Sequence, residues 1–402
     1  MFKKIINILG YVVIISQLFS IYNPILNTVV AGYTIKYIIY YTFIFISLGR
    51  WFIKLISMKT IRISDFLLCI FIVCPFAIGI LMGWGIRTVF LESVLFIMPI
   101  AVYAWSQISL INKKTCMNIF LIINFLGGII SVLVALRLLK TDIWAADGQL
   151  VRAAGAVDST LFIGGLIASL VLIYVFPENE HKDTKWLSLT AFISSIIGLL
   201  FSQSRSRLVI AFIIIAIIFI FNFFNKLSMH GNFKMIILSA IVLLLIANFA
   251  PNVMSQILVQ IQERFSTLRD INVIYRGDES SKQIQAFFTS PLFGLGWGSR
   301  SQYSGMYAHN IYTTLLMQCG IVFTACFITW FCNFIRRCIH IYNYNSKQYD
   351  IAISIMFLII LSVLGFSNAG IVQSGGYFMM LYVYLCYKDR IIVPKTHKEG
   401  LL

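Results

Sequence analysis

Long apolar stretches alternate with short polar or basic segments along almost the whole chain. An α-helix needs about 17–25 predominantly apolar residues to cross a bilayer. By this length rule the pattern predicts about twelve transmembrane helices, over residues 5–23, 28–49, 65–84, 88–110, 116–138, 159–177, 187–203, 207–224, 235–251, 309–335, 350–367 and 374–388. The seventh and eighth spans are so close together that they could also form one broken hairpin. The pattern predicts an all-α polytopic membrane protein with a single integral membrane domain over residues 1–402.

The composition strengthens this interpretation, because 59% of the residues are hydrophobic and only 11% are charged. Soluble domains carry roughly 25% charged residues. Lys3 and Lys4 precede the first apolar run, which lacks a small-residue cleavage pattern and is therefore predicted to be a span. The eight cysteines form no CxxC pair and lie in or beside spans, so no disulfide or metal site is predicted. Membrane lipids are expected partners, whereas nucleic acid is not.

Basic residues are distributed unevenly between the two sides of the predicted topology. With a cytoplasmic N-terminus, 19 lie inside and 11 outside, in agreement with the excess of positive charge in cytoplasmic loops. Both termini are therefore expected to be cytoplasmic. Lysine outnumbers arginine 14 to 5 inside, whereas arginine outnumbers lysine 9 to 2 outside. The arginine fork pairs bidentately with phosphate, which favours a phosphate-bearing ligand on the outer face. Alternatively, these arginines extend along helices toward lipid headgroups.

Two outer segments are long enough to build a site. The first, residues 139–158, contains Arg152 and Asp158. The second, residues 252–308, is predicted to be a long helical loop between the ninth and tenth spans. It should contain an amphipathic helix that includes Arg264, and a second helix from Glu279 to about Thr289 that Pro291 closes. The glycines that follow are expected to let the backbone approach a ligand closely; they are Gly294, Gly296 and Gly298.

Two arginines lie in "FSQSRSRLV", residues 201–209, at the outer boundary between two apolar spans. A turn this tight should place Arg205 and Arg207 at the membrane surface, near the level of lipid phosphates. The alternative interpretation is that both side chains only anchor the topology.

His309 is the single histidine predicted to face outward, and it lies at the first turn of the tenth span. Asn310 is adjacent, and Tyr312 follows one turn later. An imidazole titrates near neutral pH and can accept a proton from an attacking hydroxyl. A polar residue at a helix start can equally be a cap or a core hydrogen-bonding group. With no outer cysteine and no close carboxylate cluster, a zinc site is not expected.

Four stretches resemble the O-antigen ligase/polymerase superfamily in their order and spacing. They are the arginine-rich turn "SQSRSR", the outer segment "VIYRGDESSKQIQAFFTSPLFGLGWG" with Arg276, the helix start "HNIYTTLLMQCGIV", and "RAAGAVDSTLFIGGLIASL" before the middle spans. The resemblance covers residues of about 150–370, and the first half of the chain contributes only its hydropathy.

The resemblance implies a GT-C-like glycosyltransferase of the bacterial inner membrane whose active site and long outer loop are periplasmic. Its donor would be an oligosaccharide on undecaprenyl pyrophosphate. The acceptor would be a lipid-linked glycan in a polymerase, and lipid A–core in a ligase. A polymerase would also be a candidate partner for a chain-length regulator. Transfer in the superfamily is metal-independent, needs no cofactor and inverts the anomeric centre.

Carried onto this chain, the resemblance makes His309 the base or the residue that positions the acceptor. Arg205, Arg207 and Arg276 would grip the pyrophosphate, with Arg264 as a further candidate. Asp158 is a second candidate base, although an aspartate before "STLFIGG" is also what a helix N-cap would use. The absence of an extra histidine and acidic residue in "GWGS…HN" favours polymerase over ligase. A transporter is the third alternative, and the scarcity of charge inside the spans argues against it.

Overall fold

A computed structural model of the chain describes residues 2–19, 29–30, 33–57, 62–136, 138–139, 159–175, 185–202, 204–224, 255, 259, 262, 271–303, 310–342, 348–367 and 374–391. Most of these residues are helical, and the strands among them form one short antiparallel hairpin. The chain is therefore an all-α protein, as its hydropathy predicts.

The helices follow the predicted spans closely. They are α1 (Phe2–Phe19), α3 (Ile35–Ser57), α4 (Ile63–Leu81), α5 (Ile86–Ile108), α6 (Lys113–Ala135), α7 (Ser159–Leu170) with its π-helical continuation η2 (Val171–Val175), α8 (Lys185–Ser202), α9 (Arg205–Phe224), α12 (Ile271–Thr289), α13 (Arg300–Tyr303), α14 (Ile311–Tyr342), α15 (Gln348–Ser367) and α16 (Ser374–Ile391). The seventh and eighth predicted spans are separate helices, α8 and α9. The ninth, 235–251, lies outside the described residues.

The predicted span 28–49 is wrong at its start. Strands β1 (Val29–Val30) and β2 (Tyr33–Thr34) pair there, with Val29 opposite Thr34, and α3 begins only at Ile35. β-Branched and aromatic residues such as these favour strands, which a hydropathy average does not register.

Four described helices are long and apolar enough to cross a membrane, and the bent α5 would be a fifth. The four cover Ile35–Ser57, Ile63–Leu81, Lys113–Ala135 and Ile311–Arg336. Shorter apolar helices of 10–17 residues lie within α1, α7–η2, α8, α9 and α15. These helices make the chain a multi-pass membrane protein. Twelve spans and a GT-C-like fold remain predictions.

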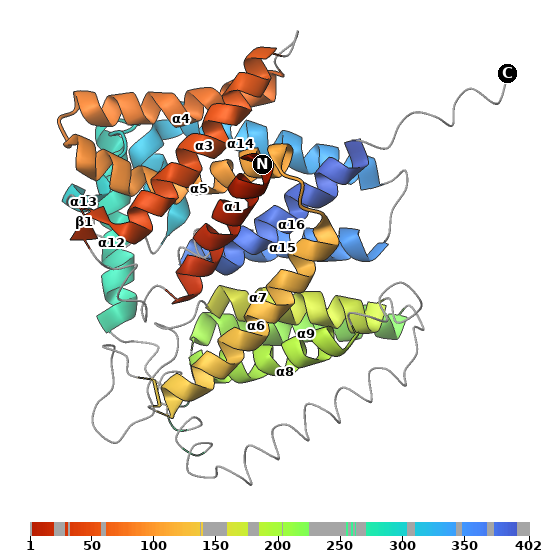
Figure 1. The fold of residues 1–402 in the computed structure, drawn as a ribbon. Helices are drawn as coiled ribbons and strands as arrows, with labels where there is room; N and C mark the ends of the chain where they lie inside the picture. Colours follow the sequence, from red (N-terminus) through yellow and green to blue (C-terminus); the bar gives the residue numbers. More distant parts are fainter. Residues whose placement is uncertain are drawn as a thin grey trace, which may run out of the picture.

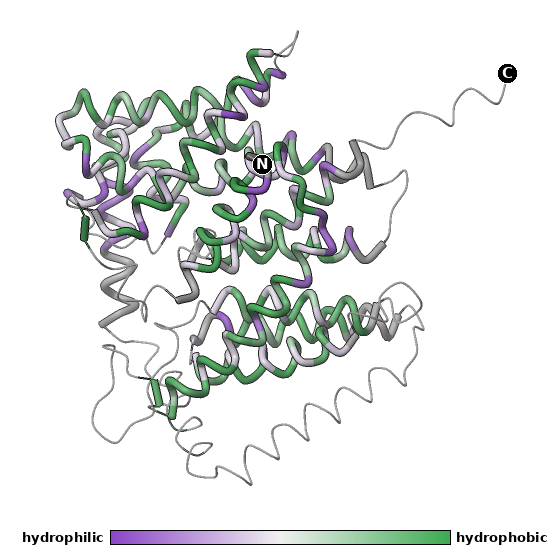
Figure 2. The backbone as a smooth tube through the Cα atoms, viewed as in Figure 1, coloured by the Kyte–Doolittle hydropathy of each residue, from purple (hydrophilic) through white to green (hydrophobic). Residues whose placement is uncertain are grey.

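The helices form two groups that α15 and α16 join (Figure 1). In one group α3 packs against α5 and α4 packs against α14, whereas in the other α8 packs against α6 and α7. Helix α16 contacts α5, α6 and α7, and its residues from Tyr377 to Tyr387 are buried. Hydrophobic residues predominate along the helices of both groups (Figure 2). A helix buried on all sides has no need of an amphipathic pattern, which explains the uniform apolarity of α16.

Helix α5 bends by 58° between Ile86–Val94 and Phe96–Ile108. Pro99 lies four residues after the break at Leu95. Proline has no N–H to donate to the carbonyl four residues earlier, and its ring clashes with that carbonyl. The proline therefore accounts for the bend, which lies directly after Glu92 and the outer part of α5.

Polar residues predicted to lie on the inner side gather at one end of the bundle. Lys113 forms an ion pair with the buried Asp350, and the hydroxyl of Tyr382 donates to the same carboxylate at 2.7 Å. Nearby, Lys388 Nζ donates to the carbonyl of Ser109 at 2.5 Å. Residues from several segments that were predicted to lie on the same side of the membrane are thus close together in the structure. Its assignment to the cytoplasm stays a prediction.

Candidate functional site

The start of α14, directly after His309, is held by a side-chain cap. Asn310 Oδ1 accepts hydrogen bonds from the N–H groups of Tyr312 and Thr313 at 3.0 and 3.2 Å. A capping side chain of this kind satisfies donors that the first helical turn leaves without partners. Asn310 therefore acts as the N-cap of α14. His309 itself lies outside the described residues, immediately before this cap.

Helix α12 docks on the start of α14 through one buried amide. Gln283, 1% exposed, accepts hydrogen bonds at Oε1 from the hydroxyls of Thr313 and Thr314. Arg276 lies on the same helix, about two turns before Gln283. The structure therefore brings the helix of Arg276 against the helix that follows His309. The Arg276 side chain and Arg264 lie outside the described residues.

The predicted second loop helix, from Glu279 to Thr289, is confirmed at its end but begins earlier, at Ile271. The missed residues include Arg276 and polar neighbours, which an apolar periodicity search does not register. Pro291 follows the helix end, as predicted.

The loop between α12 and α13 enters a break in α14 at Gly320, where φ is +62°. In a regular helix, N–H groups donate to carbonyls four residues earlier. At the break, two N–H groups and two carbonyl groups of the helix bond to the loop backbone instead. These bonds run from Ile321 N to Pro291 O (2.9 Å), Val322 N to Leu292 O (3.0 Å), Leu295 N to Met317 O (3.0 Å) and Gly296 N to Gln318 O (2.9 Å). The loop thus completes the hydrogen bonding of the broken helix.

The glycines of this loop serve close packing within the protein, which corrects their predicted role at a ligand. Gly294 and Gly296 have φ values of +70° and +75°. A Cβ at Gly294 would lie 2.4 Å from the backbone nitrogen of Gly320, and one at Gly296 would lie 2.2 Å from that of Gly79. The fully buried Trp297 follows these glycines, and its backbone N–H donates to the carbonyl of Pro75 on α4 at 3.1 Å. The sequence alone could not show that these glycines pack against other backbone segments of the protein and not against a ligand.

A buried carboxylate, Glu92 on α5, binds the end of this loop. Its exposure is 3%, and it accepts hydrogen bonds from the backbone N–H groups of Gly298 (3.0 Å), Arg300 (3.1 Å) and Ser301 (2.8 Å). The side-chain amide of Gln318, on α14, donates to the same carboxylate at 2.6 Å. Sequence reasoning did not identify Glu92 as a site residue, although a lone acid within an apolar helix is itself a functional signal.

Arg300 connects this carboxylate with α12. Burial lowers the pKa of its guanidinium, and the negative charges of Glu92 and Glu279 counteract this effect. An arginine remains protonated under such a shift, so Arg300 contributes a fixed positive charge. Helices α5, α12, α13 and α14 therefore share one buried polar cluster, which consists of Glu92, Glu279, Gln283, Arg300, Thr313, Thr314 and Gln318.

Arg205 and Arg207 lie at the start of α9, in the group of α6–α9. Arg207 is only 6% exposed, and its Nη1 donates to Ser204 Oγ at 3.0 Å. Helix α9 packs against α7 and α8, and Arg207 is buried within the protein. The placement of both arginines at the membrane surface stays a prediction. Helix α12 lies against α14 in the other group, so these two arginine-bearing helices occupy different parts of the fold (Figure 1). The Arg205 side chain, Arg152 and Asp158 lie outside the described residues.

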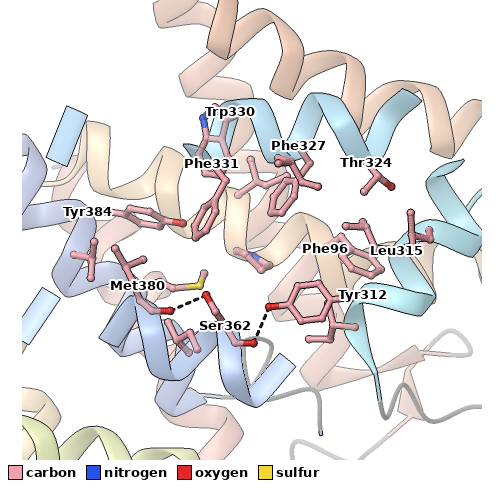
Figure 3. Close-up of a pocket in the computed structure, with 18 residues that line it drawn as sticks. Phe96, Tyr312, Leu315, Thr324, Phe327, Trp330, Phe331, Ser362, Met380 and Tyr384 are labelled. Atoms are coloured by element: carbon pink, nitrogen blue, oxygen red, sulfur yellow. Dashed lines mark hydrogen bonds between the residues drawn. The ribbon is translucent and has the colours of Figure 1, made fainter. Parts of the chain in front are cut away.

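An apolar cavity of about 260 Å³ lies between α5, α14, α15 and α16 (Figure 3). Tyr312 and Leu315 line it near the start of α14, and Trp330 and Tyr384 line it deeper in the bundle. The predicted candidate Tyr312 belongs to its wall, where its hydroxyl donates to the carbonyl of Ser362 at 2.7 Å. The lining suits a hydrocarbon chain far better than a sugar.

No group of three or more His, Cys, Asp or Glu side chains able to hold a metal is present among the described residues. His309 and Asp158 lie outside that set, so the expectation of metal-independent chemistry stays a prediction.

The fold is that of a multi-pass helical membrane protein, and its buried polar cluster lies near the start of α14. A family model described as O-antigen ligase matches residues 190–328. The match confirms the resemblance to the O-antigen ligase/polymerase superfamily, whose ligase family consists of glycosyltransferase-like enzymes. No curated protein matches the chain significantly. The matched segment includes α8, α9, α12 and the first part of α14, but neither Glu92 nor Asp158.

Proposed function

We propose that the protein is a glycosyltransferase of the bacterial inner membrane that polymerises undecaprenyl-pyrophosphate-linked O-antigen repeat units on the periplasmic face. The observation that carries this proposal is the docking of α12, which bears Arg276, against α14 directly after His309. Both helices belong to the segment that matches the ligase family. An arginine and an imidazole on adjoining elements are the groups that transfer from a pyrophosphate donor requires.

In the proposed reaction, His309 accepts a proton from the acceptor hydroxyl as its oxygen attacks the anomeric carbon of the donor sugar. The bond from that carbon to the pyrophosphate oxygen breaks, and the anomeric centre inverts. Pyrophosphate is a good leaving group, so no general acid is needed. Arg276, with Arg264 as a further candidate, would stabilise its charge. Arg205 and Arg207 lie at the start of α9 in the other group of helices and are not assigned to the same contact. Asp158 remains the second candidate base, and Arg152 a further candidate for the pyrophosphate.

The apolar cavity beside the start of α14 supports a lipid-linked donor. Its walls are almost entirely hydrocarbon and aromatic, and Tyr312 links the cavity to the first turn after His309. Apolar surface of this kind favours an isoprenoid chain through the hydrophobic effect. A donor held there would present its pyrophosphate toward the outer end of the bundle.

The ligase reaction, with lipid A–core as the acceptor, is the second candidate, and the description of the matching family favours it. The donor half of the reaction is the same in both cases. A polymerase must bind a second lipid-linked glycan as acceptor and is expected to work with a chain-length regulator.

A transporter is the third candidate, because broken helices and buried charge are common in transporters. The break in α14 and the buried Glu92 both fit that description. However, loop backbone bonds the groups at the break, and four hydrogen bonds occupy the Glu92 carboxylate. These contacts favour a fixed structural element over a gated pathway.

Purified protein, supplied in EDTA with a lipid-pyrophosphate-linked repeat unit as its only substrate, tests the proposal. A ladder of longer lipid-linked glycans on a gel would support a metal-independent polymerase. Transfer that occurs only after lipid A–core is added would favour the ligase. Absence of transfer with both acceptors would contradict a glycosyltransferase and favour the transporter.

A further inference from the structure

We propose that Glu92 is a positioning residue for glycan transfer, which holds together residues 298–301 and Gln318, the described parts of the chain before and after His309. This inference rests on the proposed function. The carboxylate accepts hydrogen bonds from Gly298, Arg300 and Ser301 before His309 in the chain, and from Gln318 after it. One side chain on α5 therefore connects the loop that leads into His309 with the helix that leads away from it.

The carboxylate form is what this arrangement requires. Its two oxygens receive four donors, of which Oε2 accepts three and Oε1 accepts the N–H of Ser301 at 2.8 Å. Hydrogen bonds to an ionised acceptor are stronger than those between neutral groups. A glutamine at position 92 would keep one acceptor oxygen and direct an amide N–H₂ at a backbone donor.

The same carboxylate acts on α12 through charge. Arg300 is attracted by both Glu92 and Glu279, and Glu279 lies one turn before Gln283 on α12. Gln283 accepts from Thr313 and Thr314 in the first turn of α14. A shift of the loop at Arg300 would therefore also alter how the helix of Arg276 lies against the helix after His309.

A positioning role predicts a specific kinetic signature. Misplacement of a reacting group by about 1 Å can reduce the rate on the order of 10²-fold. We expect Glu92→Gln to lower kcat by about that factor, with the KM for the donor changed by less than roughly threefold, because the hydrogen bonds that Glu92 accepts come from the loop backbone and from Gln318. Ser93→Ala is the matched control on the same helix, since the Ser93 hydroxyl, also buried, donates to the carbonyl of Phe90 within α5.

Hydrogen exchange of the full-length protein tests the anchor independently of activity. In the wild type, the amides of Gly298, Arg300 and Ser301 should exchange slowly. In Glu92→Gln they should exchange about tenfold faster or more, while amides of α6–α8 keep their wild-type rates. Should Glu92→Gln not fold, the wild type still decides: exchange of the amides at 298–301 at the rate of an unstructured peptide would overturn the anchor.

Four outcomes separate this inference from the proposed function. Slow wild-type exchange, with a kcat loss in Glu92→Gln and not in Ser93→Ala, supports the positioning role. Wild-type kcat in Glu92→Gln overturns it and leaves the glycosyltransferase intact. A rise in KM without a fall in kcat overturns it as well, since the residue would then serve donor binding. If the wild type itself transfers no glycan, the proposed function fails, whatever the exchange rates show.

Discussion

Replacement of Gly320 by alanine tests the broken helix and the loop that fills it. Gly320 has φ +62° and ψ −176°, a region that only glycine occupies without strain. A Cβ there would lie 2.3 Å from the nitrogen of Gly294 and 2.5 Å from the carbonyl oxygen of Leu292. Because both atoms belong to backbone, neither can rotate away, and the loop would have to move out of the break.

The expected cost combines strain with lost hydrogen bonds. An alanine in this region is strained by about 1–3 kcal/mol. Displacement of the loop would also weaken the bonds that Ile321 and Val322 donate to it, each of which contributes about 1 kcal/mol. We therefore expect Gly320→Ala to lower the free energy of unfolding by roughly 3–5 kcal/mol.

Tryptophan fluorescence of the solubilised protein in a denaturant series measures this change, since Trp297 is fully buried where the loop packs. Gly49→Ala is the matched control. Gly49 lies within α3, where an added Cβ would meet no atom within 4 Å, so this change should be neutral or stabilising by up to about 1 kcal/mol. Equal free energies of unfolding for the two variants would refute the claim that the loop packs into the break in α14.

Three further predictions concern charge and the cavity. Arg276→Ala should raise the KM for the donor about tenfold or more, and Arg276→Lys should restore only part of the loss because the bidentate fork is missing; wild-type kinetics in both would exclude a role at the pyrophosphate. Lys113→Met should destabilise the protein by about 3 kcal/mol by leaving the buried Asp350 carboxylate unpaired, measured by denaturation and contradicted by unchanged stability. Leu361→Trp, which fills the cavity, should reduce transfer, whereas Ile359→Trp on the outward, 55% exposed side of α15 should not; equal rates would separate the cavity from donor binding.

The helix boundaries were predictable because burial in a membrane imposes a simple apolar length rule. Predicted spans 159–177, 187–203 and 350–367 correspond closely to α7–η2, α8 and α15. The break in α14 was not predictable by that rule, since Gly320 lies inside a stretch that is apolar enough to be predicted as one span. Its cause is a set of backbone hydrogen bonds to residues 291–296, and backbone groups carry no sequence signature.

The site was predictable only in part. Arg276 lies on α12, which packs against α14, the helix that begins two residues after His309. The joint role of Arg276 and His309 inferred from sequence stays a prediction. Glu92 was missed because its partners are mainly backbone amides more than 200 residues away. The burial of Arg207 was not predictable because tertiary packing of α9 decides it, and a tight turn alone says nothing about which neighbours cover it.

The most direct test of the central claim compares the initial rate of glycan transfer by wild-type protein with that by His309→Ala, at equal amounts of folded protein and in EDTA. The account predicts robust transfer by the wild type and a rate at least about 10²-fold lower in the variant, since general base catalysis contributes roughly 10²–10⁴-fold. Wild-type rates in a well-folded His309→Ala protein would contradict the assignment of the site.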